Sequence, residues 1–426
     1  MQVETRPRVA CDSLVALGNA TEDGSVLFAK NSDRPAFECQ PLVQVPAQAL
    51  LGGCRVRCTY IDIPQAETTA RVIGSRPFWC WGFEHGLNEH GVAIGNHTVF
   101  TKDDLPGLGL IGMDLVRLGL ERGETATVAL EEMTRLIETY GQGGSGYGDK
   151  DWPYHNSFLI ADRKAAFLLE TSDTRWAVRE ITRVGSASNH LTISDDWSAL
   201  SDGLIEHAID RGWWAADADR RFDFAAAYRD TSIAPDFVSS GRHRQTCKFL
   251  DDRSTLVSVS SLRGALRDHY GLPWPGAGHT PADPEYFSVC MHAEPVGTTT
   301  ASMIASLPAN HHATPLYFAS LGSPCVGAFV PMFIDAEVPE ILSAASSEPS
   351  EGSPWWQLKQ LLMEVEANWT ANAPRVRAEM DRFESAVHRE ATRIAGDDAS
   401  AKSDFMRAAV DDLLSLVANL RGDLRA

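Results

Sequence analysis

The sequence predicts an antiparallel α+β fold built in layers. Hairpin signals recur, each with two short apolar segments around a cluster of turn-forming residues. Strand-rich and helix-rich stretches alternate in long blocks, which is typical of antiparallel sheets covered by helices. The chain has 426 residues and is 44% hydrophobic, so it can bury a large core.

Local patterns define the elements in order. Segments 14–17 and 26–29 flank an Asp-Gly turn and predict the first hairpin. The run 111–139 changes to helical periodicity, with a break at 123–125. The remaining predicted elements are a hairpin over 83–96, a loop over 140–147, a hairpin over 157–170, helices with breaks over 198–270, strands over 286–335, a linker or exposed loop over 343–353 and about three helices over 353–423, separated near Pro374 and at 396–398.

Charge and hydropathy exclude several classes of protein. The formal net charge of −19 disfavours nucleic-acid binding and attraction to anionic membranes. No apolar stretch reaches the length of a transmembrane helix, and the N-terminus lacks the apolar region of a secretory signal. Eight cysteines without dense, regular spacing fit a reducing compartment, so we expect a cytoplasmic protein.

Two residue pairs suggest metal ligands. Cys54 stands four residues before Cys58, and Cys290 stands two residues before His292. Neither pair has a second half at the spacing typical of zinc sites. The sequence therefore predicts no metal site and no cofactor.

Cys11 is the most informative candidate for chemistry. Residues 1–10 have no apolar run, and the ordered chain is expected to begin at Cys11. Cleavage before this residue would place a thiol nucleophile and an amine base on one residue. Folding the first hairpin about 22–23 would bring Cys11 beside Asp33 and Arg34, with Lys30 roughly 10–13 Å further along. The alternative is a buried free cysteine beside solvated charges.

The segment from Cys11 to Pro35 resembles the opening of the secernin and C69 dipeptidase family, within the cysteine N-terminal-nucleophile hydrolases. The similarity continues in order to about residue 335 and is weaker in the final helical region. Further similar segments are 86–96, 112–122, 140–144, 156–162, 188–189, 290–293 and 299–303.

The resemblance implies an αββα sandwich, in which two antiparallel sheets lie face to face between helical layers. It divides the chain into a leader at 1–10, the sandwich at 11–340 and a helical C-terminal extension at 341–426. It also implies hydrolysis of an amide, either in dipeptides or in N-acyl amides, because the relatives of the family include penicillin V acylase and bile salt hydrolase. The implied substrate is thus a small peptide or an N-acyl amide.

The family's functional residues transfer to six positions. Cys11 would be the nucleophile, and Asp33 would orient its amine or hold the thiol. Asn96 would contribute to the oxyanion hole. The other three matched positions are Lys30, Asn189 and Arg244, with Arg242 as the alternative to Arg244.

His97 departs from the family pattern, since secernins usually carry an acidic residue after the matched asparagine. A structural histidine is the simpler interpretation. Glu84 and His85 could equally form a buried pair or contact substrate. The helical end either caps the sandwich or forms a subunit interface, so a homo-oligomer is an open expectation.

Two other functions remain open at this stage. A non-catalytic interaction protein with the same fold would retain residues 1–10. A papain-like enzyme would need a histidine in contact with the Cys11 thiol, and no papain-type signature surrounds this cysteine.

Overall fold

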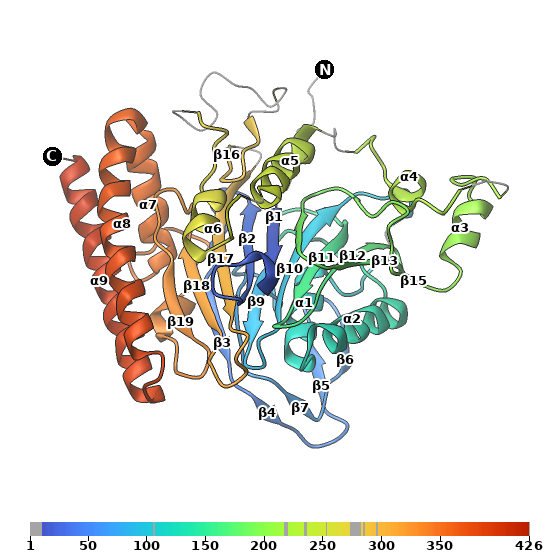
Figure 1. The fold of residues 1–426 in the computed structure, drawn as a ribbon, viewed down its shortest axis with the longest axis horizontal. Helices are drawn as coiled ribbons and strands as arrows, with labels where there is room; N and C mark the ends of the chain where they lie inside the picture. The colour runs from blue at the N-terminus through green and yellow to red at the C-terminus, as the bar shows by residue number, and fades with distance from the viewer. Residues whose placement is uncertain are drawn as a thin grey trace.

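The computed structural model describes residues 11–104, 107–216, 220–233, 237–252, 254–272, 283, 286–294 and 297–425. Two antiparallel sheets form its centre (Figure 1). The first contains, in spatial order, β14 (Val184–Ala187), β1 (Cys11–Ala16), β2 (Val26–Arg34), β17 (Gly297–Leu307), β18 (Leu316–Leu321) and β19 (Val330–Phe333), with β16 (His292–Ala293) paired to β17.

The second sheet is built mainly from hairpins. Its spatial order is β15 (Ala199–Leu200), β13 (Arg175–Ile181), β12 (Ala166–Ser172), β11 (His155–Ala161), β10 (Ala93–Val99), β9 (His85–Asn88), β8 (Val72–Ser75) and β3 (Leu42–Val45). Two short ribbons lie apart from it: β4 (Gln48–Ala49) with β7 (Thr68–Thr69), and β5 (Arg55–Arg57) with β6 (Asp62–Pro64).

The helices are α1 (Gly112–Arg122), α2 (Ala126–Tyr140), α3 (Leu204–Asp210), α4 (Phe224–Tyr228), α5 (Phe237–Asp251), α6 (Val259–Leu266), α7 (Pro354–Glu366), α8 (Trp369–Ile394) and α9 (Ala399–Arg425). The break predicted at 123–125 separates α1 from α2, and the Thr125 side chain caps α2 by accepting from the Val128 N–H at 3.2 Å. No helix within the described ranges is long and apolar enough to cross a membrane.

Alternation of side chains along the strands generates four layers. Val15 of β1 enters the core between the sheets, where Leu159 of β11 also lies. Leu14, the preceding residue, packs on the opposite face with Leu262 of α6. The outer face of the second sheet packs on α1 and α2. The layers are therefore α5 with α6, the first sheet, the second sheet, and α1 with α2, which confirms the predicted αββα architecture.

The register of the first hairpin differs from the sequence prediction. Cys11 lies opposite Ser32, and Lys30 lies opposite Ser13, two residues along. The connection contains a 3₁₀ turn at Gly18–Ala20, so the pairing is displaced from the register expected from the Asp-Gly step. Because cross-strand partners share a face, this register places Lys30 on the same face as Cys11 and Asp33 on the other face.

The three C-terminal helices lie along the edge of the first sheet formed by β18 and β19 (Figure 1). Their apolar side chains belong to the same hydrophobic core as the space between the sheets. The predicted break near Pro374 is wrong, because Pro374 lies inside α8. The chain leaves helical geometry at Asn368 instead, where φ is −152° and ψ is 73°.

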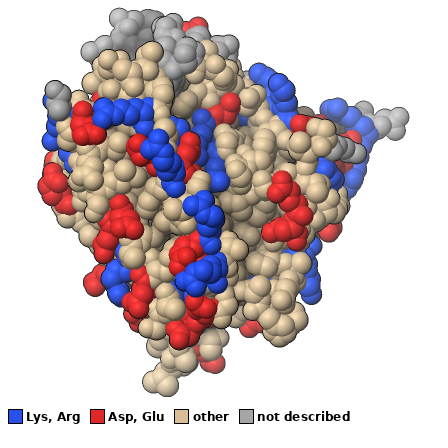
Figure 2. Space-filling model, turned by 60° about the vertical axis from the view of Figure 1, so that its left-hand side comes forward, with Lys and Arg blue, Asp and Glu red and all other residues tan. Residues whose placement is uncertain are grey.

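Acidic and basic side chains are interspersed over the face toward these helices (Figure 2). On α8, Glu390 pairs with Arg393 at 2.6 Å, and Arg375 pairs with Asp423 of α9 at 2.7 Å. Such exposed pairs contribute little to stability.

Glu384 of α8 is different because its carboxylate is buried. It accepts hydrogen bonds from Arg263 at 2.7 Å, from Arg267, and from the Phe329 backbone N–H at 2.7 Å. This single side chain thereby connects α8 to α6 and to the segment before β19.

We expect Glu384→Gln to lower the free energy of unfolding by about 2 kcal/mol, because it removes the buried negative charge that pairs with Arg263, Arg267 and Arg377. Glu390→Gln, on the same helix, serves as the matched control and should change stability by less than about 0.5 kcal/mol. Urea unfolding of both variants measures the difference, and equal effects would contradict the structural role of Glu384.

Candidate active site

Cys11 begins β1, and its side chain is 2% exposed. Because cross-strand neighbours share a face, Cys11, Ser13, Lys30 and Ser32 all face the second sheet. Gly95 of β10 leaves the space for Lys30, since a Cβ there would lie 2.4 Å from Lys30 Cδ. The thiol thus faces a polar region between the two sheets.

The backbone nitrogen of Cys11 is held by a side chain. Its N–H donates to Asn189 Oδ1 at 2.6 Å. Asn189 follows β14 and donates through Nδ2 to the Thr98 carbonyl of β10 at 3.0 Å. The asparagine therefore connects the start of β1 to the second sheet.

Arg242 of α5 completes this arrangement. Its guanidinium is fully buried, donates through Nη2 to Asn189 Oδ1 at 3.0 Å, and forms an ion pair with Asp12. Arg244, in contrast, is exposed. Arg242, and not Arg244, therefore contacts Asn189 and Asp12, because residues two apart on a helix point in different directions.

Asp33 lies beside Cys11 on the neighbouring strand. The Thr299 hydroxyl of β17 donates to Asp33 Oδ1 at 2.6 Å, while Asp33 Oδ2 is buried without a partner. Asp12 Oδ1 is likewise buried and unpartnered. Burial raises the pKa of the Asp33 carboxyl to about 8, although the nearby Arg242 opposes this rise.

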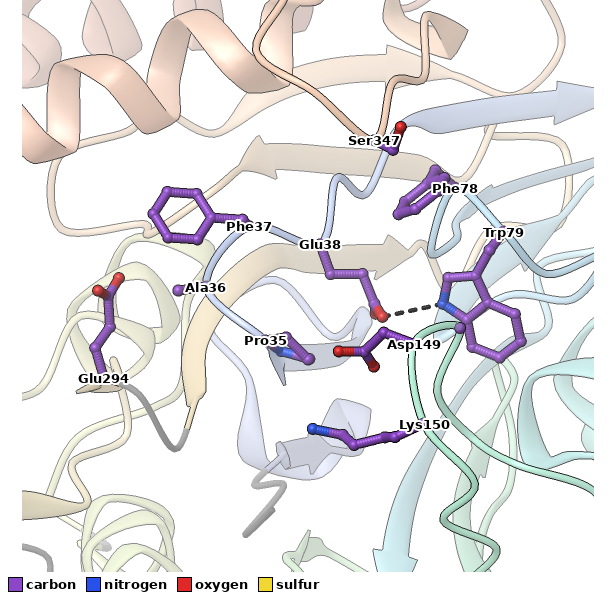
Figure 3. Close-up of a pocket in the computed structure, with 11 residues that line it drawn as sticks. Pro35, Ala36, Phe37, Glu38, Phe78, Trp79, Asp149, Lys150, Glu294 and Ser347 are labelled. Carbon is purple, nitrogen blue, oxygen red and sulfur yellow. Dashed lines mark hydrogen bonds between the residues drawn. The ribbon is translucent and has the colours of Figure 1, made fainter. Parts of the chain in front are cut away.

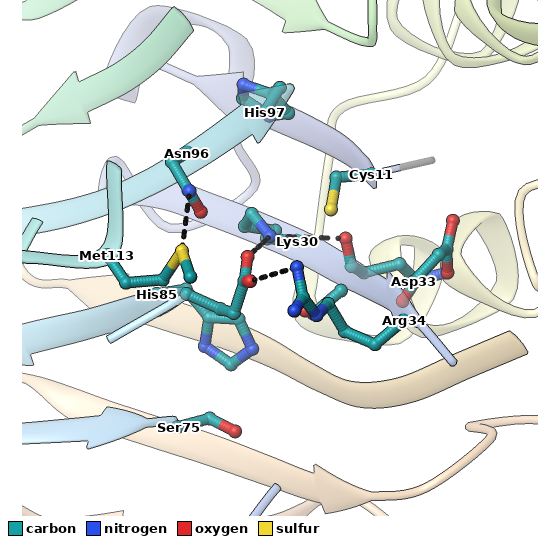
Figure 4. A network of polar contacts seen from close by, with 12 residues as sticks. Cys11, Lys30, Asp33, Arg34, Ser75, His85, Asn96, His97 and Met113 are labelled. Carbon is teal, nitrogen blue, oxygen red and sulfur yellow. Dashed lines mark hydrogen bonds and ion pairs between the residues drawn. The ribbon is translucent and has the colours of Figure 1, made fainter. Parts of the chain in front are cut away.

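A second group of charges surrounds the thiol on the inner face. Glu84 lies between two cations, with Lys30 Nζ at 3.7 Å and Arg34 Nη1 at 3.3 Å (Figure 4). Burial raises the pKa of the Cys11 thiol to about 11, and the positive charge of Lys30 partly opposes the effect. At neutral pH this thiol is protonated and needs a base to become a nucleophile.

Asn96 makes contacts other than those expected of an oxyanion donor. Figure 4 draws its side chain beside Met113. When the amide is oriented so that both its ends are satisfied, Nδ2 donates to Glu84 Oε2 at 2.8 Å and to the Glu84 carbonyl at 2.9 Å. These bonds position Glu84, and through it Lys30, and none of them reaches Cys11.

The nearby histidines have structural contacts. His97 lies within hydrogen-bonding distance of Ser13 Oγ, at 2.6 Å, and of Ser157 Oγ, at 3.3 Å. Burial holds the pKa of His97 well below its usual value, so the ring is neutral. His85 Nδ1 lies 2.9 Å from the Tyr317 hydroxyl. Within the described part of the chain, no histidine is hydrogen-bonded to the Cys11 sulfur, as a papain-like mechanism would require.

Glu170 of β12 positions the segment that carries Asn189. Its Oε1 accepts from the Thr192 N–H at 2.7 Å and its Oε2 from the Ile193 N–H at 3.0 Å. A buried carboxylate with several donors restrains the backbone three residues beyond Asn189.

A cavity of about 510 Å³ begins at the end of β2 (Figure 3). Its aromatic lining comes from Phe37, Phe78 and Trp79, and its charged lining from Glu38, Asp149, Lys150 and Glu294. Glu38 accepts from Trp79 Nε1 at 3.0 Å and from Arg34 Nε at 2.6 Å. Since Arg34 also contacts Glu84, one ion-pair network extends from the cavity wall to the surroundings of the thiol.

No protein-family model matches the chain. Similar solved structures include a variant of conjugated bile acid hydrolase from Clostridium perfringens, with a TM-score of 0.41, 12% identity, and coverage of 73% of this chain and 89% of that chain. For penicillin V acylase from Agrobacterium tumefaciens, the TM-score is 0.41, the identity 14%, and the coverage 76% and 86%.

A Caenorhabditis elegans ortholog of N-acylethanolamine-hydrolyzing acid amidase gives a TM-score of 0.35, 9% identity, and coverage of 70% of this chain and 93% of that chain. These similarities are too distant to indicate an activity or a substrate. Both are therefore argued below from the residues of this chain.

Sequence reasoning did not select Asp12, although it directly follows Cys11. The available signal was a charged residue at the start of an otherwise apolar strand. Sequence reasoning also left Glu84 ambiguous, and the structure shows that it links Lys30 to Arg34.

Replacing Arg242 with alanine should lower the free energy of unfolding by about 3–5 kcal/mol, because Asp12 then remains buried without a counter-charge. Arg244→Ala is the matched control and should cost less than about 0.5 kcal/mol. Chemical unfolding distinguishes the two variants, and a larger loss in Arg244→Ala would contradict the assignment of Arg242.

The raised pKa of Asp33 predicts that stability depends on pH. The measurement uses Cys11→Ala, in which residues 1–10 should remain attached. Between pH 3.8 and about pH 8, the folded chain keeps a proton on Asp33 that the unfolded chain has lost. The free energy of unfolding should therefore fall as the pH rises through this range. Adding Asp33→Asn should remove this part of the slope in urea titrations at several pH values. An unchanged slope would contradict the raised pKa.

Proposed function

We propose that this protein is a self-processing cysteine amide hydrolase and that peptides, dipeptides above all, are its substrates. The observation that carries the proposal is the hydrogen bond from the Cys11 backbone nitrogen to Asn189 Oδ1, at 2.6 Å. A nitrogen held in this way is suited to act as an α-amine base once the preceding peptide bond is cut.

The unpartnered carboxylate oxygens support this interpretation. Asp12 Oδ1 and Asp33 Oδ2 are both buried without a hydrogen-bond donor. Asp12 follows Cys11 in sequence, and Asp33 lies beside it on the paired strand β2. Arg242 supplies one positive charge to these two carboxyl groups. A new α-ammonium group at Cys11 would add the missing donor and the missing positive charge.

In the processing step, Cys11 Sγ attacks the carbonyl carbon of residue 10. The peptide C–N bond breaks, a thioester forms, and the proton lost by the thiol is transferred to the nitrogen, which becomes the free α-amine. Water then hydrolyses the thioester, which releases residues 1–10 with a new carboxylate and regenerates the thiol.

In turnover, the α-amine removes the proton from the Cys11 thiol, directly or through a water molecule. Its reference pKa of about 7.7–8.0 suits this exchange near neutral pH. The thiolate attacks the substrate carbonyl, the amine returns the proton to the leaving nitrogen, and water hydrolyses the acyl-enzyme. Lys30, on the same face as the thiol, would stabilise negative charge, while Asn189 and Asp33 would orient the amine.

The cavity beside β2 supports a peptide substrate. Lys150 offers a cation for a free carboxylate, and Asp149 offers an anion for a free amine, while Glu38 and Glu294 are already paired with Arg34 and Lys359. Phe78 and Trp79 in the same cavity favour a second candidate, an N-acyl amide whose apolar chain would pack on the rings.

Intact mass and N-terminal sequencing of the wild type and of Cys11→Ala test the processing step. The wild type should begin at Cys11, and Cys11→Ala should retain residues 1–10. Cys54→Ala is the matched control and should be processed like the wild type. A wild-type chain that retains residues 1–10 would contradict the proposal and favour a non-catalytic interaction protein.

Lys150→Gln distinguishes the two substrate classes in the processed enzyme. For dipeptides, KM should rise about tenfold, as expected for the loss of about 1.4 kcal/mol of charge pairing. For N-acyl amides without a carboxylate, KM should stay unchanged. The exposed Lys164→Gln serves as the control. A faster reaction with N-acyl amides than with any dipeptide would favour the acylase alternative.

A further inference from the structure

Four side chains with metal-binding atoms meet beside the first sheet. They come from segments that are remote in sequence from Cys11. They are His269, Cys290, His292 and Cys325, and one ligand atom from each lies within 4.8 Å of the others. His269 follows α6, Cys290 and His292 lie at β16, and Cys325 lies between β18 and β19. Among the described residues, this is the one group of its kind.

The spacing of these atoms matches a tetrahedral site. Cys290 Sγ lies 3.6 Å from His292 Nε2, and Cys325 Sγ lies 3.2 Å from the same nitrogen. Around a tetrahedral Zn²⁺ with Zn–S bonds of about 2.3 Å and Zn–N bonds of about 2.0 Å, sulfur and nitrogen are separated by roughly 3.5 Å. The two sulfurs and His292 Nε2 therefore have the spacing of ligands around one ion, and His269 places a fourth ligand atom within 4.8 Å of them.

The histidines are oriented for ligation. His292 Nδ1 lies 3.0 Å from Glu366 Oε1 at the end of α7, which leaves the lone pair on Nε2 directed at the two sulfurs. His269 Nε2 is buried without a hydrogen-bond partner. A carboxylate behind one histidine and an unpartnered nitrogen on the other are both features of histidines that bind a metal ion.

The backbone that carries the ligands is held independently of any ion. The Cys290 N–H donates to the Asp268 carbonyl at 3.0 Å. Asn31 of β2 donates through Nδ2 to the Leu266 carbonyl at 2.9 Å and to the Val289 carbonyl at 2.8 Å. Segments before and after the site are therefore positioned by the sheet.

We propose that His269, Cys290, His292 and Cys325 bind one Zn²⁺ as a closed structural site. Four protein ligands leave no open position for a substrate or for water, which distinguishes such a site from a catalytic one. The ion would tie the end of α6, β16 and the β18–β19 connection together.

The site would also support Asp33. The Met291 N–H, between two ligands, donates to Thr299 Oγ1 at 2.8 Å, and Thr299 in turn donates to Asp33 Oδ1 at 2.6 Å. The sequence alone did not indicate this group of four, because only Cys290 and His292 are close in sequence. The other two ligands come from distant segments that the fold brings together.

Zinc content of the full-length chain, purified without chelator or added zinc, tests the proposal. The wild type should hold about one zinc per chain by plasma mass spectrometry, and the double variant Cys290→Ser with Cys325→Ser less than about a tenth of that amount. Cys247→Ser is the matched control, because Cys247 also contacts a histidine, His243 at 3.4 Å, and it should retain the metal.

Two further measurements test zinc binding without the double variant, in case that variant folds poorly. Co²⁺ added to metal-free wild type should give thiolate-to-metal charge-transfer absorption, and Cys11→Ala should bind zinc as the wild type does. Zinc binding thus succeeds or fails independently of the proposed hydrolase. A wild type without zinc, a double variant that retains it, or a Cys290–Cys325 disulfide in the wild type would overturn the proposal.

Discussion

The start of β1 depends on the buried ion pair between Arg242 and Asp12. Both side chains are fully buried, so each would be costly without the other. The pair also holds Asn189, whose Oδ1 accepts from Arg242 and from the Cys11 nitrogen. Three segments far apart in sequence meet there: β1, the residues after β14, and α5. Their polar groups are buried away from water and therefore bind one another.

This constraint explains why Cys11 has different surroundings on its two sides. Its nitrogen belongs to the cluster under α5, while its thiol faces the interior between the sheets beside Lys30. Asp33, whose side chain lies on the face opposite that of Lys30, is joined through Thr299 to Met291, which lies between two of the proposed zinc ligands. The proposed metal would therefore support the surroundings of Cys11 and would take no part in the proposed reaction.

Local sequence patterns predicted the parts of the fold that depend on neighbouring residues. The hairpins, the break between α1 and α2 and the break at 396–398 all follow from turn formers or periodicity. The register of β1 on β2 could not be predicted in the same way, because the 3₁₀ turn at Gly18–Ala20 alters the length of the connection.

In the candidate site, too, the sequence identified individual residues but not the contacts that depend on distant segments. The resemblance selected Cys11, Asp33 and Asn189, which the structure brings together. It matched Arg244 with Arg242 as the alternative, and it could not settle the choice because that depends on which face of α5 packs on β1. Asn96 is a comparable case, since its contact with Glu84 arises only from the pairing of the strands.

Above all, we propose that the α-amine of Cys11 is the base. The direct test uses the chain that begins at Cys11, with its thiol reversibly protected while the α-amine is acetylated near neutral pH, where the lysines remain protonated. After deprotection, hydrolysis of dipeptides should be lost although the thiol is intact and the fold is unchanged by circular dichroism. Full activity of the acetylated enzyme would contradict the account and require a different base.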